Sequence, residues 1–388
     1  MALTSGSIIS EEAAQAALDA LLAECVRQAA SDLHLAPGQP PFLRVRGELV
    51  PIAEHALLDA GEVLAMTQQL LRHCGGERGS ERLAASGAQD GAFSGIDGTR
   101  YRFNAFRRQG GVSLAIRRLA DRFRTLTELG LPESLYALCD LPDGGLVVVA
   151  GPTGAGKSTT LAALVDRINQ TSRRHLITIE DPVEYLHTPA QCLINQRQIG
   201  ADAASFHDAL IASLREDPDV IVVGEVRDLD TIRTAIRAAE TGHLVFTSVH
   251  AGDSAGTIER LVSVFPADEQ PGIRQQLALV LRAVVSQRLL PRDGSTRGQG
   301  PRERIAACEI LIGTPAIANL IAAGKSAQIL SAIEGGSTLG MQTLEQDLAR
   351  LLAGGIISEG TALAATRHPG MVQERLALMQ RRAPGAAR

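Results

Sequence analysis

One glycine-rich octapeptide constrains the fold more than any other feature of this chain. Residues Gly151–Ser158 read GPTGAGKS and fit the pattern G-x-x-x-x-G-K-[ST]. The residues just before it, Leu146–Ala150, form a continuous apolar run, which is typical of a strand buried on both faces of a parallel sheet. A helix is predicted directly after the octapeptide. The order of strand, glycine-rich loop and helix predicts an α/β domain with a phosphate-binding loop.

The residue types in this loop explain how it would hold a phosphate. Glycines allow backbone N–H groups to converge on phosphate oxygens, and the next helix points its positive end at the same anion. We expect Lys157 to reach the β- and γ-phosphates of ATP and Ser158 to bind Mg²⁺. Of the 38 basic residues only Lys157 and Lys325 are lysines, and a compact ammonium suits this pocket better than a guanidinium. The predicted nucleotide-binding residues are Gly151, Pro152, Thr153, Gly154, Ala155, Gly156, Lys157, Ser158 and Thr159.

The chain around the loop alternates between short apolar runs and helical stretches. Strands are predicted at Leu176–Ile179, Val220–Val223 and Leu244–Thr247, with helices such as Leu229–Glu240 between them. This alternation is typical of a parallel sheet covered on both faces. From Asp268 onward the pattern predicts mostly helix.

The first part of the chain has a different pattern, that of a smaller α+β domain. We predict a domain over residues 1–118, a linker over 119–133, and the phosphate-binding domain over 134–388, with a disordered tail from about 382. The expected elements of the first domain are helices at Glu11–Ala30 and Ala60–Cys74 and strands at Ser31–Leu35, Phe42–Val45, Gly91–Ser94, Tyr101–Phe106 and Val112–Arg117.

Acidic residues and histidines stand where predicted strands begin or end. Glu184 closes an acidic segment after Leu176–Ile179, and Glu225 follows Val220–Val223 almost at once, as in a Walker B motif. Such an acid holds Mg²⁺, usually through water. His243 precedes the next strand and His250 follows it, and each could be a structural or a catalytic residue. His250 lies at the C-terminal end of its strand, where it could contact the γ-phosphate.

Composition argues against several other classes of protein. The net charge is −5 and aromatic residues make up only 3% of the chain, which disfavours binding of nucleic acid through a basic groove or stacking platforms. The five cysteines include no C-x-x-C pair, so a zinc ribbon is not expected. No membrane span is predicted, because the apolar run around Leu277–Val285 contains Arg282. We expect a cytoplasmic protein.

Taken together, four segments resemble the secretion/type IV pilus ATPase family. In order they match its Walker A motif, Asp box (around Glu184), Walker B motif (around Glu225) and His box (His243–His250). Within that family the chain is most similar to the twitching-motility retraction ATPases. Five segments carry this likeness: Ser31–Gly47 (SDLHLAPGQPPFLRVRG), Tyr101–Phe106 (YRFNAF), Leu214–Asp219 (LREDPD), Glu240–Phe246 (ETGHLVF) and Leu339–Leu344 (LGMQTL). The resemblance covers roughly residues 12–365.

The resemblance implies a PAS-like first domain, a RecA-like P-loop NTPase domain and a homohexamer that uses ATP and Mg²⁺. It implies that Glu184 is the general base, that Glu225 supports Mg²⁺, and that His243 and His250 sense the nucleotide. Arg102 and Arg117 would reach the phosphates when the two domains close. Charge neutralisation of this kind suits phosphoryl transfer. The implied partner is an inner-membrane pilus or secretion platform protein, which would hold the motor at the membrane periphery.

Three departures from the family pattern bear on activity. Ile211 stands where a second arginine is usual, and Ala318, Ala322 and Ala323 replace charged residues of a segment found in the retraction subfamily. The third departure is the sequence that begins at Ser248, where the family usually has TLHT.

Four functions therefore remain open from sequence. The chain could be a retraction motor, an assembly or secretion motor, a weakly hydrolysing nucleotide-binding ring, or a RecA-like protein that handles DNA. Assembly motors of the family carry paired C-x-x-C motifs that are absent here, and this favours the retraction motor.

Overall fold

The computed structural model describes residues 10–53, 55–74, 76–119, 122–293 and 304–382. By internal contacts it divides into two compact units. The first comprises Met1–Arg122, Glu180–Leu186 and Gln196–Ser205, and the second comprises Phe123–Ile179, His187–Asn195 and Phe206–Arg388. The expected tail after Arg382 lies outside the described residues, as do residues 120–121 of the expected linker.

The first unit is built on a six-stranded sheet of order β3-β2-β1-β6-β5-β4. Every pairing recorded in this sheet is antiparallel. Its elements are α1 (Glu11–Arg27), β1 (Asp32–Leu35), β2 (Phe42–Val45), β3 (Glu48–Pro51), α2 (Ala60–Leu71), the 3₁₀ turn η1 (Arg72–Cys74), α3 (Glu77–Ser86), β4 (Ala88–Ser94), β5 (Arg100–Arg108) and β6 (Gly111–Arg118).

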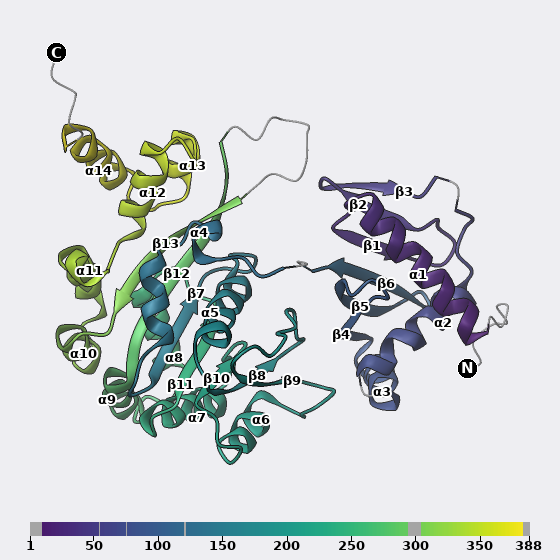
Figure 1. Ribbon diagram of the computed structural model, residues 1–388, viewed down its shortest axis with the longest axis horizontal. Coiled ribbons are helices and arrows are strands. Elements are labelled where there is room, and N and C mark those ends of the chain that lie inside the picture. The colour runs from purple at the N-terminus through teal and green to yellow at the C-terminus, as the bar shows by residue number, and fades with distance from the viewer. Residues whose placement is uncertain (1–9, 54, 75, 120–121, 294–303, 383–388) are drawn as a thin grey trace. The chain divides into compact units, whose positions relative to one another are not determined.

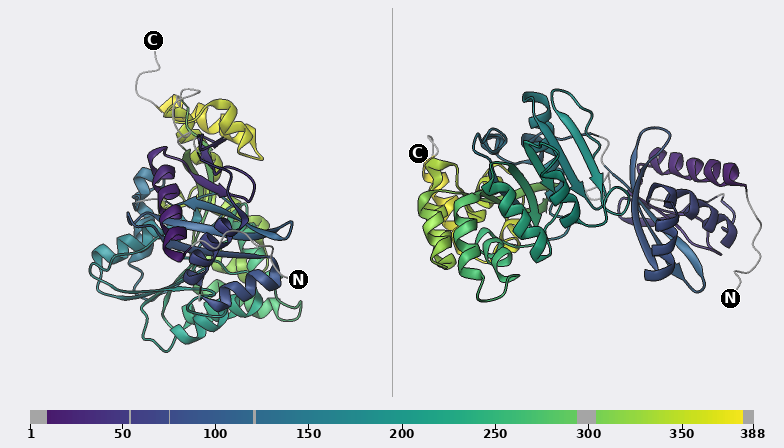
Figure 2. Two further views of the ribbon diagram at one scale, coloured as in Figure 1. Left: turned by 90° about the vertical axis from the view of Figure 1, so that its right-hand side faces the viewer. Right: turned by 90° about the horizontal axis from the view of Figure 1, so that it is seen from below.

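Helices α1 and α2 close the core of the first unit on one side of this sheet (Figure 2, right). Leu18 of α1, Met66 of α2 and Phe103 of β5 are all 1% exposed or less and belong to one apolar cluster. Along β5 buried residues alternate with partly exposed ones, so the arginines at positions 100 and 102 point to the opposite face from Phe103. The first unit thus presents polar side chains on the face that α1 and α2 leave open.

The second unit is built on a seven-stranded sheet of order β13-β12-β7-β11-β10-β8-β9 (Figure 1). Its elements are α4 (Leu126–Leu129), η2 (Glu133–Cys139), β7 (Gly145–Ala150), α5 (Lys157–Thr171), β8 (His175–Glu180), β9 (Leu193–Gln198), α6 (Phe206–Ser213), β10 (Val220–Val223), α7 (Leu229–Glu240), β11 (Leu244–Val249), α8 (Ser254–Ser263), α9 (Gln270–Val280), β12 (Leu281–Pro291), β13 (Arg304–Ile312), α10 (Pro315–Ala322), η3 (Ser326–Gln328), α11 (Ile329–Gly335), η4 (Ser337–Leu339), α12 (Leu344–Ala353), α13 (Glu359–Ala364) and α14 (Pro369–Arg382).

Strands β7, β8, β10, β11 and β12 run parallel to one another, and β13 is antiparallel to β12. All six residues of β7 are buried, because helices cover both faces of the sheet. Val147 and Val149 belong to the apolar cluster that contains α5. The core therefore fixes β7, and with it the start of the glycine-rich loop, at the centre of the sheet.

Helices predominate from Asp268 onward, as predicted, but the prediction missed two long strands in this region. Two of the longest strands, β12 and β13, lie there. Helix α9 ends at Val280 and β12 begins at Leu281, so helix and strand share one apolar run with no turn residue between them. A strand buried on both faces shows no polar alternation that would mark the change.

Candidate functional site

The glycine-rich loop joins the end of β7 to the start of α5. Gly151, Gly154 and Gly156 have φ angles of +153°, +78° and +90°. Side chains of L-residues strain such a backbone, so these positions favour glycine. Gly156 is the N-cap of α5, and the first N–H groups of that helix have no partner within the helix. The loop thus has the form of an anion-binding turn.

Lys157 is nearly buried against this loop, with 8% of its surface exposed. Its Nζ donates hydrogen bonds to the carbonyl oxygens of Gly151 at 3.0 Å and Pro152 at 3.1 Å. It also lies 3.5 Å from Nδ1 of His250. The ammonium is therefore held over the loop by the carbonyl groups of the loop itself.

A glutamine that the sequence analysis missed supports the same loop. Gln287 of β12 is 2% exposed, and its Nε2 donates to the carbonyl oxygen of Ala155 at 2.7 Å. Its Oε1 accepts a hydrogen bond from Oγ1 of Thr160 at 2.9 Å. A signal existed in the sequence, since Ser286 and Gln287 interrupt an apolar run, and buried polar residues need partners.

Glu225 and His250 follow β10 and β11, which are neighbouring parallel strands. Their side chains therefore meet at one edge of the sheet, with 3.5 Å between His250 Nε2 and Glu225 Oε2. The other carboxylate oxygen of Glu225 is 2.6 Å from Arg227 Nη2. Lys157, His250, Glu225 and Arg227 thus form a continuous row of polar contacts beside the loop.

The electrostatics of this row favour a neutral imidazole. Burial, the Lys157 ammonium and the Arg227 guanidinium lower the pKa of His250, and they outweigh the Glu225 carboxylate, which raises it. A neutral ring accepts a hydrogen bond at one nitrogen and donates one from the other.

Ser248, the first residue of the altered His-box sequence, also connects the ends of β10 and β11. The hydroxyl of Ser248 donates to the carbonyl oxygen of Gly224 at 2.6 Å. This bond ties the end of β11 to the residue just before Glu225.

His243 is not brought to this edge within the chain. It precedes β11 and lies at the opposite end of that strand from His250. Its Nδ1 is 3.0 Å from the carbonyl oxygen of Ala238 and 3.0 Å from Oγ1 of Thr241. These contacts are those of a residue that caps the end of α7.

The remaining predicted residues belong to the first unit. Arg102 of β5 and Arg117 of β6 are directly opposite each other in the register of the two strands. Nε of Arg117 donates to Asp32 Oδ1 at 2.8 Å. Arg102 lies 3.6 Å from Asp90 and 3.9 Å from Glu184. Both guanidinium groups are thus paired with carboxylates inside their own unit.

The Asp-box segment that carries Glu184 is also held within the first unit. The guanidinium of Arg100 donates to the carbonyl oxygen of Val183 at 3.3 and 3.4 Å, and the Val183 N–H donates to Gln198 Oε1 at 3.3 Å. Desolvation lowers the pKa of Arg100, although the Glu180 carboxylate opposes this shift. The backbone next to Glu184 is therefore fixed from both sides.

The residues of the second unit fit a nucleotide with its metal ion. Ser158 is exposed in the first turn of α5, while Lys157 beside it is buried. A Cβ atom added to Gly156 would lie 3.1 Å from Gln287 Nε2, a tight contact, on a backbone with φ of +90° that favours glycine. The hydroxyl of Ser158 and the carboxylate of Glu225 are the oxygen ligands that Mg²⁺ prefers.

These features define the second unit as a P-loop nucleotide-binding domain of the RecA-like kind, attached to a smaller α+β domain. The chain belongs to the type II/IV secretion system protein family, whose model matches residues 10–309. The predicted family and fold class are thereby confirmed.

Individual relatives are similar over most of the chain. This chain is 44% identical over 353 residues to the type IV pilus retractation ATPase PilT of Pseudomonas aeruginosa. The match covers 90% of this chain and 98% of the relative. The chain is 37% identical to the type IV pilus ATPase PilU of the same organism, over 89% of this chain and 87% of the relative. The crystal structure of the pilus retraction motor PilT with bound ADP matches with a TM-score of 0.82 and 39% identity, over 92% of this chain and 99% of that one.

Proposed function

We propose that this chain is an ATP-hydrolysing motor subunit that works as a homohexamer to retract a type IV pilus. The observation that carries the proposal is the row formed by Lys157, His250 and Glu225 beside the glycine-rich loop. Two of the proteins named above, the retraction ATPase PilT and the crystallised retraction motor PilT, are matched over 98% and 99% of their length and support the same function.

In this proposal the P-loop residues Gly151–Thr159 bind ATP, and each polar residue has one task. Lys157 neutralises the β- and γ-phosphates, and Ser158 and Glu225 hold Mg²⁺, the latter through water. When bound, the metal neutralises charge on the phosphate oxygens. The proposed task of the neutral ring of His250 is to contact the γ-phosphate, and its distance of 3.5 Å from Lys157 Nζ supports this assignment.

The tasks assigned to the first unit complete the reaction. Glu184 polarises the attacking water, and Arg102 and Arg117 neutralise charge that builds up on the phosphates. The proposed task of His243 is to sense the nucleotide from the far end of β11. The mechanical partner is an inner-membrane platform protein of the pilus, and the motor acts on it from the cytoplasm.

Steady-state phosphate release tests the enzymatic part. We expect Glu184→Gln to abolish release while ATP binding is retained, because the amide cannot take the proton of the attacking water. Glu374→Gln, at an exposed position of α14, is the matched control and should release phosphate at the parental rate. If Glu184→Gln releases phosphate at the rate of this control, Glu184 is not the general base.

A deletion strain tests the direction of work. Loss of a retraction motor leaves surplus, immobile pili, whereas loss of an assembly or secretion motor leaves none. Counting surface fibres therefore separates the two motors.

A weakly hydrolysing regulatory ring is the second candidate, because Ile211 is 37% exposed on α6 where a second arginine is usual in the family. The same phosphate-release assay on the parental chain decides this point. Release that does not exceed the Glu184→Gln background favours the regulatory ring.

A further inference from the structure

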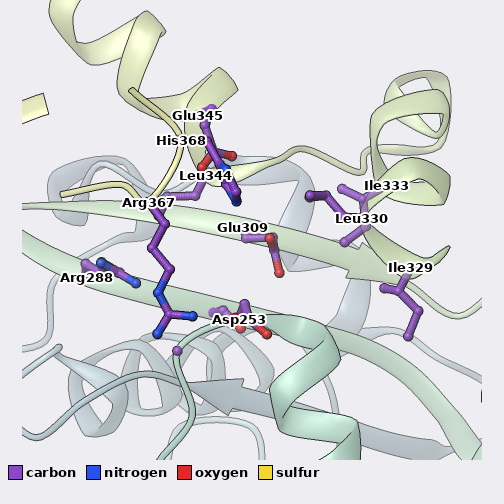
Figure 3. A pocket seen from close by; sticks show the side chains of 12 residues that line it. Asp253, Arg288, Glu309, Ile329, Leu330, Ile333, Leu344, Glu345, Arg367 and His368 are labelled. Carbon is purple, nitrogen blue, oxygen red and sulfur yellow. The ribbon is translucent and has the colours of Figure 1, made fainter. Parts of the chain in front are cut away.

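A cavity of about 130 Å³ lies within the second unit, apart from the glycine-rich loop. Its lining comes from the loop after β11, from β12 and β13, from helices α11 and α12, and from the loop before α14 (Figure 3). The proposed function uses none of these lining residues.

One side of the cavity carries hydrogen-bond donors without an acceptor. Ser286 is 3% exposed, and its Oγ has no hydrogen-bond partner among the described residues. The same holds for Nε of Arg288, although Nη1 of that residue donates to the carbonyl oxygen of Ala365 at 2.7 Å. Figure 3 shows Arg367 extending to the same side, toward the loop of Asp253. Buried donors of this kind call for an acceptor such as a carboxylate.

Two buried carboxylates line the same cavity. Glu309 is 6% exposed and accepts a hydrogen bond from the N–H of Ser254 at 2.7 Å. Glu345 is 5% exposed and accepts one from Thr366 Oγ1 at 2.7 Å. Burial raises the pKa of Glu309, so its charged form is costly unless a cation approaches it. An ionised carboxylate has about four lone-pair sites, so each of these groups can accept further donors.

A metal ion is not the cation indicated here. Across the described ranges, no group of three or more His, Cys, Asp or Glu side chains is arranged to hold one. An ammonium group needs only acceptors and no fixed coordination number, and it therefore suits a pair of carboxylates better.

The third feature of the cavity is its apolar wall. Ile329, Leu330 and Ile333 come from α11, and Leu344 comes from the start of α12. In Figure 3 the two arginines and the α11 side chains lie on opposite sides of Glu309. The site thus offers donors, acceptors and aliphatic surface to one small ligand.

We propose that this cavity binds a small aliphatic α-amino acid. Its carboxylate accepts hydrogen bonds from Ser286, Arg288 and Arg367, its ammonium meets Glu309 and Glu345, and its side chain packs on α11. A cavity of roughly 150 Å³ holds benzene in other proteins, so the volume suits a ligand the size of valine. This binding goes beyond the proposed function and does not depend on it.

Isothermal titration calorimetry of the full chain with L-valine tests the proposal. We expect one site per chain, and at least tenfold weaker binding of isovalerate, which lacks the ammonium, and of isobutylamine, which lacks the carboxylate. Equal binding of either analogue, or no binding of L-valine, would overturn the assignment.

Two arginine variants locate the site. Arg367→Gln changes an exposed residue at the cavity and should weaken L-valine binding at least tenfold without loss of helical circular dichroism. Arg260→Gln, at an exposed position of α8 that does not line the cavity, should bind as the parent does. If both variants bind L-valine with parental affinity, the cavity is not the binding site.

Discussion

Thr160 and Gln287 lie 127 positions apart in the sequence and are joined by a buried hydrogen bond of 2.9 Å. Gln287 uses its other end to hold the carbonyl oxygen of Ala155. One side chain of β12 thus fixes both the glycine-rich loop and the first turn of α5. The shape of the phosphate cradle depends on a strand far away in the sequence.

The first prediction concerns this glutamine. Gln287→Ala leaves a buried hydroxyl and a buried carbonyl without their partner, which costs about 1–3 kcal/mol. We expect the midpoint of urea unfolding to fall, and the affinity for a fluorescent ATP analogue to fall with it. The control is Gln275→Ala, at an exposed position of α9, which should stay within about 0.5 kcal/mol of the parent. Equal unfolding midpoints and affinities in the two variants would contradict the support role.

The second prediction compares two glycines of the loop. A Cβ at position 151 would lie 2.5 Å from the carbonyl oxygen of Gln287 and 2.8 Å from Cβ of Ala155, on a backbone with φ of +153°. A Cβ at position 154 would meet nothing within 4 Å, on a backbone with φ of +78°. We expect Gly154→Ala to cost about 1–2 kcal/mol from backbone strain alone. Gly151→Ala should cost clearly more, because β12 or the loop must shift.

Urea unfolding without nucleotide measures this difference directly. Circular dichroism is the suitable signal, since the chain has no tryptophan. Equal destabilisation by the two substitutions would contradict the prediction, because it would show that the contacts of a Cβ at position 151 add nothing to the free-energy cost of backbone strain.

The sequence predicted the centre of the fold well, because its signals there are local. Val220–Val223 and Leu229–Glu240 were predicted with the bounds that the structure gives to β10 and α7. The loop glycines and Lys157 likewise lie in one short segment, which the structure places between β7 and the start of α5. Glu225 and His250 follow apolar strands, and parallel pairing then brings them together.

The sequence failed where a role depends on contacts between distant segments. The polar interruption of an apolar run indicates that Gln287 needs a partner, but it does not indicate that the partner is the glycine-rich loop. Nothing local marks Asp32 as the partner of Arg117 across β1 and β6. His243 and His250 look alike in sequence, yet β11 separates them. Tertiary pairing decided each of these cases.

The third prediction concerns Asp32. Burial alone would raise the pKa of this carboxyl, but hydrogen bonds from Ser31 and Arg117 and the charge of Arg117 hold the pKa below its ordinary value. A lowered pKa in the folded state stabilises the protein above the unfolded-state pKa, and that contribution is lost as pH falls through the folded value.

Asp32→Asn should therefore lower the unfolding midpoint at pH 7, and the gap to the parent should shrink from about pH 4 downward. Asp143→Asn, at an exposed turn before β7, controls for loss of a carboxylate. A gap that stays constant down to pH 2 would show that the ionised form of Asp32 does not contribute.

The last prediction concerns His187 of the second unit. Its ring stacks on Phe123 with 4.5 Å between ring centroids, and burial lowers its pKa to about 4. The unfolded state then binds more protons than the folded state between about pH 6.5 and pH 4, so stability falls as pH falls through that window. One such group contributes a slope that approaches about 1.4 kcal/mol per pH unit.

His187→Gln removes this titration and also the stacked ring. At pH 7.5 the variant should be less stable than the parent, because the stacking on Phe123 is lost. As pH falls toward 4.5 the parent should lose stability faster, so the two urea midpoints should converge. His55→Gln, which changes an exposed histidine, should follow the parent at every pH. Parallel pH curves for His187→Gln and the parent would mean that the imidazole of His187 is protonated as easily in the folded chain as in the unfolded one.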